Sequence, residues 1–122
     1  MSMEIVNRNE VEAFITKDGS EIREILAPRN SSLRNQSLAE ARVSRGKATI
    51  RHCHIESEEI YYILQGKGQI GVEGEAREVT EGDGIAIMPG QSHRIWNTGV
   101  EDLVFLCYCS PSYSDEDTVL TE

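Results

Sequence analysis

The stretch GKATIRHCHIESEEIYYILQG, residues 46–66, decides how this chain is interpreted. It contains His52 and His54, two positions apart in a segment whose alternation is typical of a β-strand. Side chains two apart on a strand point to the same face, so both imidazoles can reach one point. Glu58 and Glu59 follow a few residues later, and after a turn of the chain either carboxylate could reach the same point. Because both faces of the segment after them are apolar, alternation does not choose between these two glutamates.

The last of the chain's 3 histidines, His93, lies further along in a segment punctuated by Gly and Pro. Three imidazoles and one carboxylate suit a divalent first-row metal, namely Fe, Mn, Ni, Co, Cu or Zn. A six-coordinate ion with these ligands keeps roughly two positions open for water or substrate, as a catalytic metal requires. The sequence therefore predicts one metal site with open positions.

Length and charge narrow the class of protein. A chain of 122 residues predicts one domain. The net charge of -9 argues against a nucleic-acid partner and against an anionic membrane surface, both of which favour basic proteins. A mean hydropathy of -0.40 and the lack of a long apolar run predict no membrane span. Residues 1–9 contain no apolar stretch of signal-peptide length, so we expect a cytoplasmic protein.

The 3 cysteines, an odd number without a secretion signal, predict reduced thiols. Cys107 and Cys109 share one face of a predicted strand, and we expect small buried core residues there. A soft-metal pair would need a second Cys/His pair at usable spacing. Cys53 lies between two candidate ligands, so we expect it to face away from the metal.

The rest of the chain reads as short strands separated by turns. One short helical turn is predicted at residues 9–15, where Asn9 and Glu12 form a possible capping box. Glu73-Gly74 is a hairpin signal. Short strands at this spacing indicate an antiparallel sandwich or barrel. Strands are predicted at residues 21–26, 37–43, 49–54, 59–64, 69–72, 75–79, 85–88, 94–97 and 103–109.

Two predicted strands, 60–64 and 103–109, lack a polar face. In a small one-domain sandwich the outer face of a strand meets water and should alternate. Apolar residues on both faces therefore indicate that something covers the outer face, either the N-terminal segment or a second subunit. We predict a homodimer formed by packing of sheets.

The two histidine segments resemble the two motifs of the cupin superfamily, in particular its small single-domain microbial members. The spacing to Gly66 selects Glu59 over Glu58 as the acidic position of the first motif. Met88 stands where the family usually has proline, which serves a turn there and is not a ligand. The matching positions are Gly46, His52, His54, Glu59 and Gly66 in the first motif, and Gly82, Met88, Gly90, His93 and Asn97 in the second.

This resemblance implies an all-β fold, a double-stranded β-helix or jelly-roll barrel, with a short N-terminal extension. It implies that His52, His54, Glu59 and His93 bind one metal inside the barrel. The expected division is an extension at 1–35 that packs on the barrel or on a partner subunit, a barrel at 36–113 and an acidic tail at 114–122. Many members of the family dimerise, which agrees with the covered faces.

The expected activity is that of a metal-dependent enzyme on a small organic molecule, of the dioxygenase or the isomerase/lyase type. The alternatives are a non-catalytic module that binds or senses a small molecule through its metal, and a scaffold that the metal stabilises. If Glu59 points inward, so does Tyr61, as a hydrogen-bond donor or general acid/base near the metal. An aromatic core filler is the commoner role for such a tyrosine. Gln36 and Glu40 line the site only if residues 37, 39, 41 and 43 do not.

Overall fold

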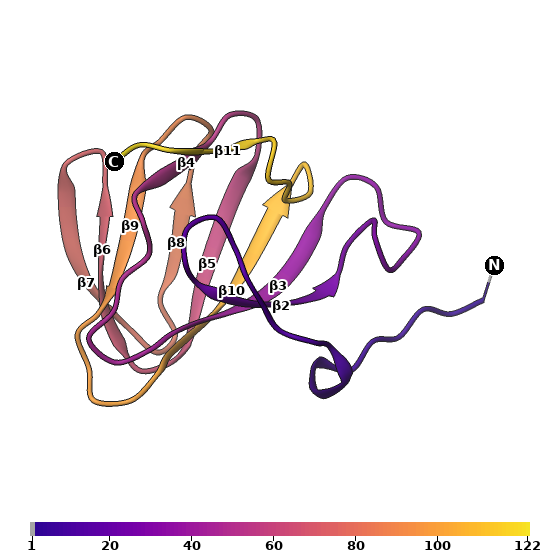
Figure 1. Cartoon of the computed structure of the whole chain (residues 1–122), viewed down its shortest axis with the longest axis horizontal. Coiled ribbons are helices and arrows are strands. Elements are labelled where there is room, and N and C mark those ends of the chain that lie inside the picture. Colours follow the sequence, from indigo (N-terminus) through magenta and orange to yellow (C-terminus); the bar gives the residue numbers. More distant parts are fainter. Residues whose placement is uncertain (1) are drawn as a thin grey trace.

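Two antiparallel sheets lie face to face in the computed structural model, which describes residues 2–122 (Figure 1). One sheet has the strand order β1 (Phe14–Ile15), β2 (Glu21–Leu26), β3 (Ser37–Val43), β10 (Leu103–Ser110), β5 (Glu58–Gln65) and β8 (Gly84–Ile87). The other has the order β11 (Thr118–Leu120), β4 (His52–His54), β9 (His93–Asn97), β6 (Lys67–Val72) and β7 (Glu75–Thr80). The all-β double-stranded β-helix predicted from the sequence is confirmed.

The β6–β7 hairpin follows the sequence signal closely. Glu73 and Gly74 have φ angles of 48° and 83°, and these two residues join β6 to β7. Two consecutive positive φ angles are what a tight hairpin with the twist of its strands requires, and glycine tolerates the second at little cost.

The predicted helical turn at residues 9–15 is wrong. A 3₁₀ turn, η1 (Arg8–Glu10), forms earlier, because the Asn7 side chain accepts a hydrogen bond from the Asn9 backbone N–H at 2.8 Å. Phe14–Ile15 instead pairs with β2 as the short strand β1. An aromatic and a β-branched residue favour this extended pairing over helix.

Both ends of the chain contribute to the sheets. Within the expected N-terminal extension, β1 and β2 join the six-stranded sheet beside β3. Within the expected tail, β11 pairs with β4, the strand that carries two of the histidines. The extension and the tail therefore both reach the barrel, while the domain boundaries themselves stay a prediction. No helix within residues 2–122 is long and apolar enough to cross a membrane.

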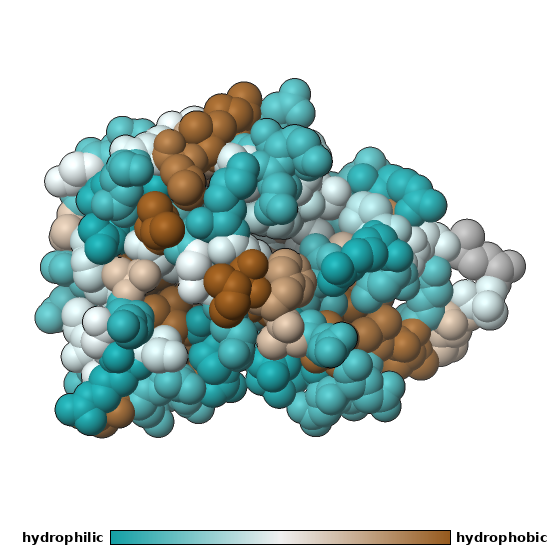
Figure 2. Space-filling view, viewed as in Figure 1, coloured by the Kyte–Doolittle hydropathy of each residue, from teal (hydrophilic) through white to brown (hydrophobic). Residues whose placement is uncertain are grey.

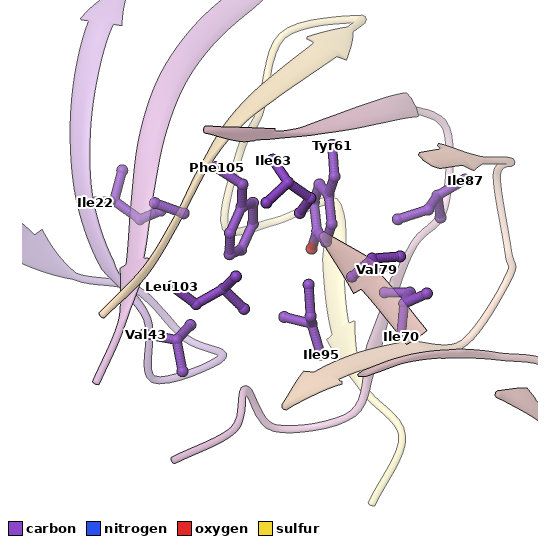
Figure 3. Close-up of a cluster of buried hydrophobic side chains, with 11 residues drawn as sticks. Ile22, Val43, Tyr61, Ile63, Ile70, Val79, Ile87, Ile95, Leu103 and Phe105 are labelled. Atoms are coloured by element: carbon purple, nitrogen blue, oxygen red, sulfur yellow. The ribbon is translucent and has the colours of Figure 1, made fainter. Parts of the chain in front are cut away.

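The core fills the space between the two sheets. Tyr61 and Phe105 of the six-stranded sheet face Ile70 and Ile95 of the five-stranded sheet (Figure 3). Burying each large apolar side chain stabilises the fold by about 1.5–3 kcal/mol. Tyr61 and Phe105 of this core also line the cavity that adjoins the histidines.

The outer face of β5 is apolar and open. Ile60, Tyr62 and Leu64 are 48%, 45% and 43% exposed, whereas Tyr61 and Ile63 between them are buried. On the side shown in Figure 2, hydrophobic residues form separate patches among hydrophilic ones. The exposed strip agrees with the pattern from which the homodimer was predicted, and the homodimer stays a prediction.

Candidate metal centre

The three histidines converge inside the barrel. One ring nitrogen of each of His52, His54 and His93 lies within 4.8 Å of those of the other two, and all three side chains are buried. His52 and His54 occupy the two ends of β4, so both point inward. His93 begins β9 and pairs directly with His52. The cluster can hold a metal ion.

Two of the rings are held by backbone carbonyls. His52 Nδ1 lies 2.7 Å from the Ile50 carbonyl oxygen, and His93 Nδ1 lies 2.9 Å from the Gln91 carbonyl oxygen. A carbonyl only accepts, so each Nδ1 carries the proton and each Nε2 keeps its lone pair. Metal-binding histidines are typically oriented by such a bond at the other ring nitrogen.

The His54 ring is held by Thr118. The Thr118 hydroxyl donates to the Ser114 carbonyl oxygen at 2.9 Å, which uses its only proton. It must therefore accept from His54 Nδ1, 3.1 Å away. All three rings thus turn Nε2 towards the centre of the cluster.

His93 Nε2 supports a bound ion. It is buried and has no hydrogen-bond partner among the described residues. Leaving such a group unsatisfied costs about 1–3 kcal/mol. A metal ion at the centre would accept its lone pair, so the donor set and the unsatisfied atom both fit the predicted divalent metal.

Glu59 contacts two of the three histidines of the cluster, and Glu58 points away. Glu59 Oε1 lies 3.1 Å from His54 Nε2 and 3.4 Å from His93 Nε2, whereas Glu58 is exposed. Burial alone would raise the pKa of Glu59, but the hydrogen bond and charge of His54 outweigh burial and lower it to about 2. Glu59 is therefore an anion at neutral pH. Its other oxygen, Oε2, accepts from the Cys109 thiol at 3.4 Å.

The histidines differ in their protonation without metal. Burial lowers the pKa of His52, with the charge of His93 acting in the same direction. Burial also works against protonation of His54, but the hydrogen bond and charge of Glu59 outweigh it and raise its pKa. His54 therefore holds a proton more readily than His52.

A cavity adjoins the cluster and opens to the surface. Ser37, Ala39 and Ala41 line it, which settles the orientation of β3. Glu40 points outward and accepts from Arg8 Nε at 2.9 Å. The Gln36 side-chain oxygen accepts a hydrogen bond from the Tyr108 hydroxyl, and Gln36 does not line the cavity.

Tyr61 lies at the inner wall of this cavity. It is buried, lines the cavity, and its ring centroid is 5.9 Å from that of His93. Burial, with the nearby Glu59 charge, raises the pKa of Tyr61 well above its ordinary value. Its hydroxyl therefore stays protonated and can donate a hydrogen bond.

Cys109 is buried as predicted and Cys107 is only partly buried, and both of these side chains also face the cavity. Cys107 and Cys109 line it, and burial raises the pKa of both thiols. Both therefore stay protonated. Cys53 is buried and does not line the cavity, as expected from its position between two inward-facing histidines.

Sequence reasoning missed two residues at the centre. Thr118 orients His54 from β11, and the side chain of Asp18, in the turn between β1 and β2, lies 3.4 Å from His52 Nε2 through Oδ2. Nothing in the local sequence around Asp18 relates it to His52. Only the fold brings these segments together.

The comparisons with known proteins agree with this geometry. A sequence model of the family described as Cupin domain matches residues 39–109. The uncharacterised protein MJ1618 of Methanocaldococcus jannaschii is 47% identical over 114 residues, which are 93% of this chain and 91% of that protein. An oxalate-binding protein of Thermotoga maritima is 38% identical over 69 residues, 57% of this chain and 57% of that protein.

A solved structure extends the similarity to three dimensions. The crystal structure of a predicted oxalate decarboxylase from Thermotoga maritima has a TM-score of 0.77 and 28% identity, over 88% of this chain and 99% of that one. The family match covers more than half of the chain and includes the three histidines and Glu59. The chain therefore belongs to the cupin family.

Proposed function

We propose that this protein is a metal-dependent enzyme that acts on a small organic molecule. One observation carries the proposal: three oriented imidazoles turn Nε2 to one buried point beside a cavity, and one of these nitrogens has no hydrogen-bond partner within residues 2–122. A purely structural site usually closes all positions of its metal. Here a cavity adjoins the cluster, which favours a metal that meets a ligand.

The proposed ligands are His52, His54, Glu59 and His93, and the metal is one of Fe, Mn, Ni, Co, Cu or Zn. Such an ion polarises an oxygen of a bound molecule and stabilises the negative charge that develops on it. That chemistry serves both oxygenase and isomerase/lyase reactions. The chain's own residues hold the site and shape its cavity.

The cavity wall restricts the substrate class. Its lining residues, all within the described chain, include neither Lys nor Arg. A phosphorylated substrate would lack a cationic partner there, so an oxygen of the substrate would have to meet the metal itself. Small carboxylates or enolisable carbonyl compounds fit this requirement. The names of two relatives, an oxalate-binding protein and a predicted oxalate decarboxylase, make oxalate a first compound to test.

Tyr61 is the proposed hydrogen-bond donor to the substrate. Its raised pKa keeps the proton on the hydroxyl, so donation is favoured over action as a base. Phe105, whose ring centroid is 4.6 Å from that of Tyr61, restricts the ring's movement.

A second candidate function is binding or sensing without turnover. The relative named as an oxalate-binding protein favours it, because the same site could hold a carboxylate without chemical change. The barrel and the ligand set are compatible with both functions.

One experiment separates the two. Protein loaded in turn with each of the six metals is incubated with oxalate and a panel of small carboxylates and carbonyl compounds, and product and oxygen uptake are measured. Ligand consumption that the Tyr61→Phe variant lowers supports the enzyme. Saturable binding without consumption supports the binding module, and neither binding nor consumption contradicts both.

A further inference from the structure

We propose that Asp18 supplies a further carboxylate ligand to the metal, in addition to His52, His54, Glu59 and His93. The inference rests on the proposed metal site and adds a residue outside the matched family segment, 39–109. Asp18 lies in the turn between β1 and β2, and its side chain is 13% exposed. Its Oδ2 faces His52 Nε2 at 3.4 Å.

The two carboxylates cover different parts of the cluster. Glu59 contacts His54 and His93, and Asp18 contacts His52, the histidine that Glu59 does not contact. Ligands at about 2.0–2.2 Å from an ion stand about 3 Å apart when they are adjacent in an octahedron. The 3.1 Å and 3.4 Å contacts of Glu59 and the 3.4 Å contact of Asp18 are all close to that spacing.

Hydrogen bonds hold the Asp18 carboxylate in this orientation. Its Oδ1 accepts from the Thr16 hydroxyl at 2.7 Å, from the Ser20 backbone N–H at 2.9 Å and from the Ser20 hydroxyl at 2.7 Å. Three donors on one oxygen leave Oδ2 free to face His52. A carboxylate fixed through one oxygen is preorganised to offer the other to a cation.

Hydrogen bonds connect the turn that contains Asp18 to the segments around the site. The Asp18 carbonyl oxygen accepts from the Ile50 backbone N–H at 2.7 Å, two residues before His52. The Lys17 ammonium donates to the carbonyl oxygens of Asp115 and Thr118, each at 2.9 Å. The position of Asp18 is thus linked to the same segments that hold His52 and His54.

The pairing of Asp18 with His52 is unfavourable without a cation. Because His52 gives its Nδ1 proton to Ile50, its Nε2 lone pair points towards the Asp18 oxygen, and two electron-rich atoms then face each other. A metal ion between them turns this repulsion into two favourable bonds. Two carboxylates also neutralise a divalent ion, which lowers the cost of burying it.

A further protein ligand changes what the site can bind. With Asp18 in place a six-coordinate metal keeps about one open position, not two. A substrate that chelates through two oxygens must then displace Asp18, whereas one that binds through a single oxygen need not.

The test compares Co²⁺ binding by the wild-type protein and the Asp18→Asn variant, by calorimetry and by the visible spectrum of the Co²⁺ complex. The amide oxygen of Asn can keep the bonds from Thr16 and Ser20 while its NH₂ group, which cannot bind a metal, replaces Oδ2. Asp83→Asn is the matched control, since Asp83 also accepts in a turn, from the Thr80 N–H at 2.8 Å, but does not line the cavity of the metal centre.

We expect Asp18→Asn to weaken Co²⁺ binding by about 10–100-fold and to change the spectrum, and Asp83→Asn to do neither. Equal affinity and an unchanged spectrum in Asp18→Asn, with wild type binding Co²⁺, would overturn the role of Asp18 alone. If the wild-type protein binds none of the six metals, Co²⁺ included, the metal site itself is overturned. The melting temperature of metal-free Asp18→Asn, expected at or above that of wild type because the repulsion with His52 is removed, shows whether the variant folds.

Discussion

His93 pairs directly with His52 across strands β9 and β4, and this register brings the histidine of the second motif onto the pair in the first. The residues are far apart in sequence, yet their ring centroids lie 4.2 Å apart. A slip of this register by one residue would turn His93 away from the barrel interior. The strand pairing is therefore as necessary to the centre as the residue types.

The charge of Glu59 should matter to metal binding more than its size. Glu59→Gln keeps the shape of the side chain but replaces one ligand oxygen and removes the anion beside His54 and His93. We expect metal affinity to fall by about 10–100-fold, measured by competition with a chelator. Glu58→Gln is the matched control, because Glu58 is exposed on the same strand. Equal losses in both variants would contradict the assignment of Glu59.

Metal binding should release a proton in a defined pH range. Glu59 raises the pKa of His54 above its ordinary value, so metal-free His54 adds stability that is full below about pH 6.5 and is lost as pH rises through its folded pKa. Binding requires the neutral ring, so metal must displace this proton. Glu59, with a pKa of about 2, and His52, with its lowered pKa, are already deprotonated.

We therefore expect affinity to increase with pH through this range, with release of up to about one proton per metal. Calorimetry in two buffers of different ionisation enthalpy measures the release. Glu59→Gln should reduce it, because His54 loses the neighbour that raises its pKa. An affinity independent of pH, without proton release, would show that His54 does not bind the metal through Nε2.

The residues of this centre that are placed by local sequence patterns could be predicted, and those placed by contacts between distant segments could not. Alternation placed His52 and His54 on one face, and the resemblance to the cupin motif, through its spacing to Gly66, selected Glu59; both depend on residues close together in the chain. Asp18 and Thr118 reach the centre through contacts between segments far apart in the chain: the Asp18 carbonyl oxygen accepts from the Ile50 backbone N–H, and β11 pairs with β4. No local pattern carries that information.

The secondary-structure elements also divide into those that the local sequence predicts and those that it does not. The predicted strand ranges overlap β2 to β10, whereas β1, with 2 residues, and β11, with 3, were missed because neither is long enough to show a period. The helical turn was misplaced because Asn7 and Asn9 both suit a helix cap, and only the fold shows that Asn7 is used.

The exposed strip on β5 should mediate self-association. Ile60, Tyr62 and Leu64 would gain from burial against a second copy, and Tyr62→Glu would place a charge in that contact. We expect wild type to elute as a dimer in light-scattering chromatography at micromolar concentration and Tyr62→Glu to shift towards monomer. Glu78→Lys, a charge change on the exposed strand β7 of the other sheet, is the control. A monomeric wild type would rule out the homodimer.

The central claim is that the histidine cluster binds the metal. Its most direct test is the metal content of wild type and of the His52→Ala, His54→Ala double variant, each purified without added metal and measured by mass spectrometry. We expect about one ion per chain in wild type and almost none in the variant, because the variant loses two of the three imidazoles, the ligands that suit these metals. Stoichiometric metal in the double variant would contradict the account.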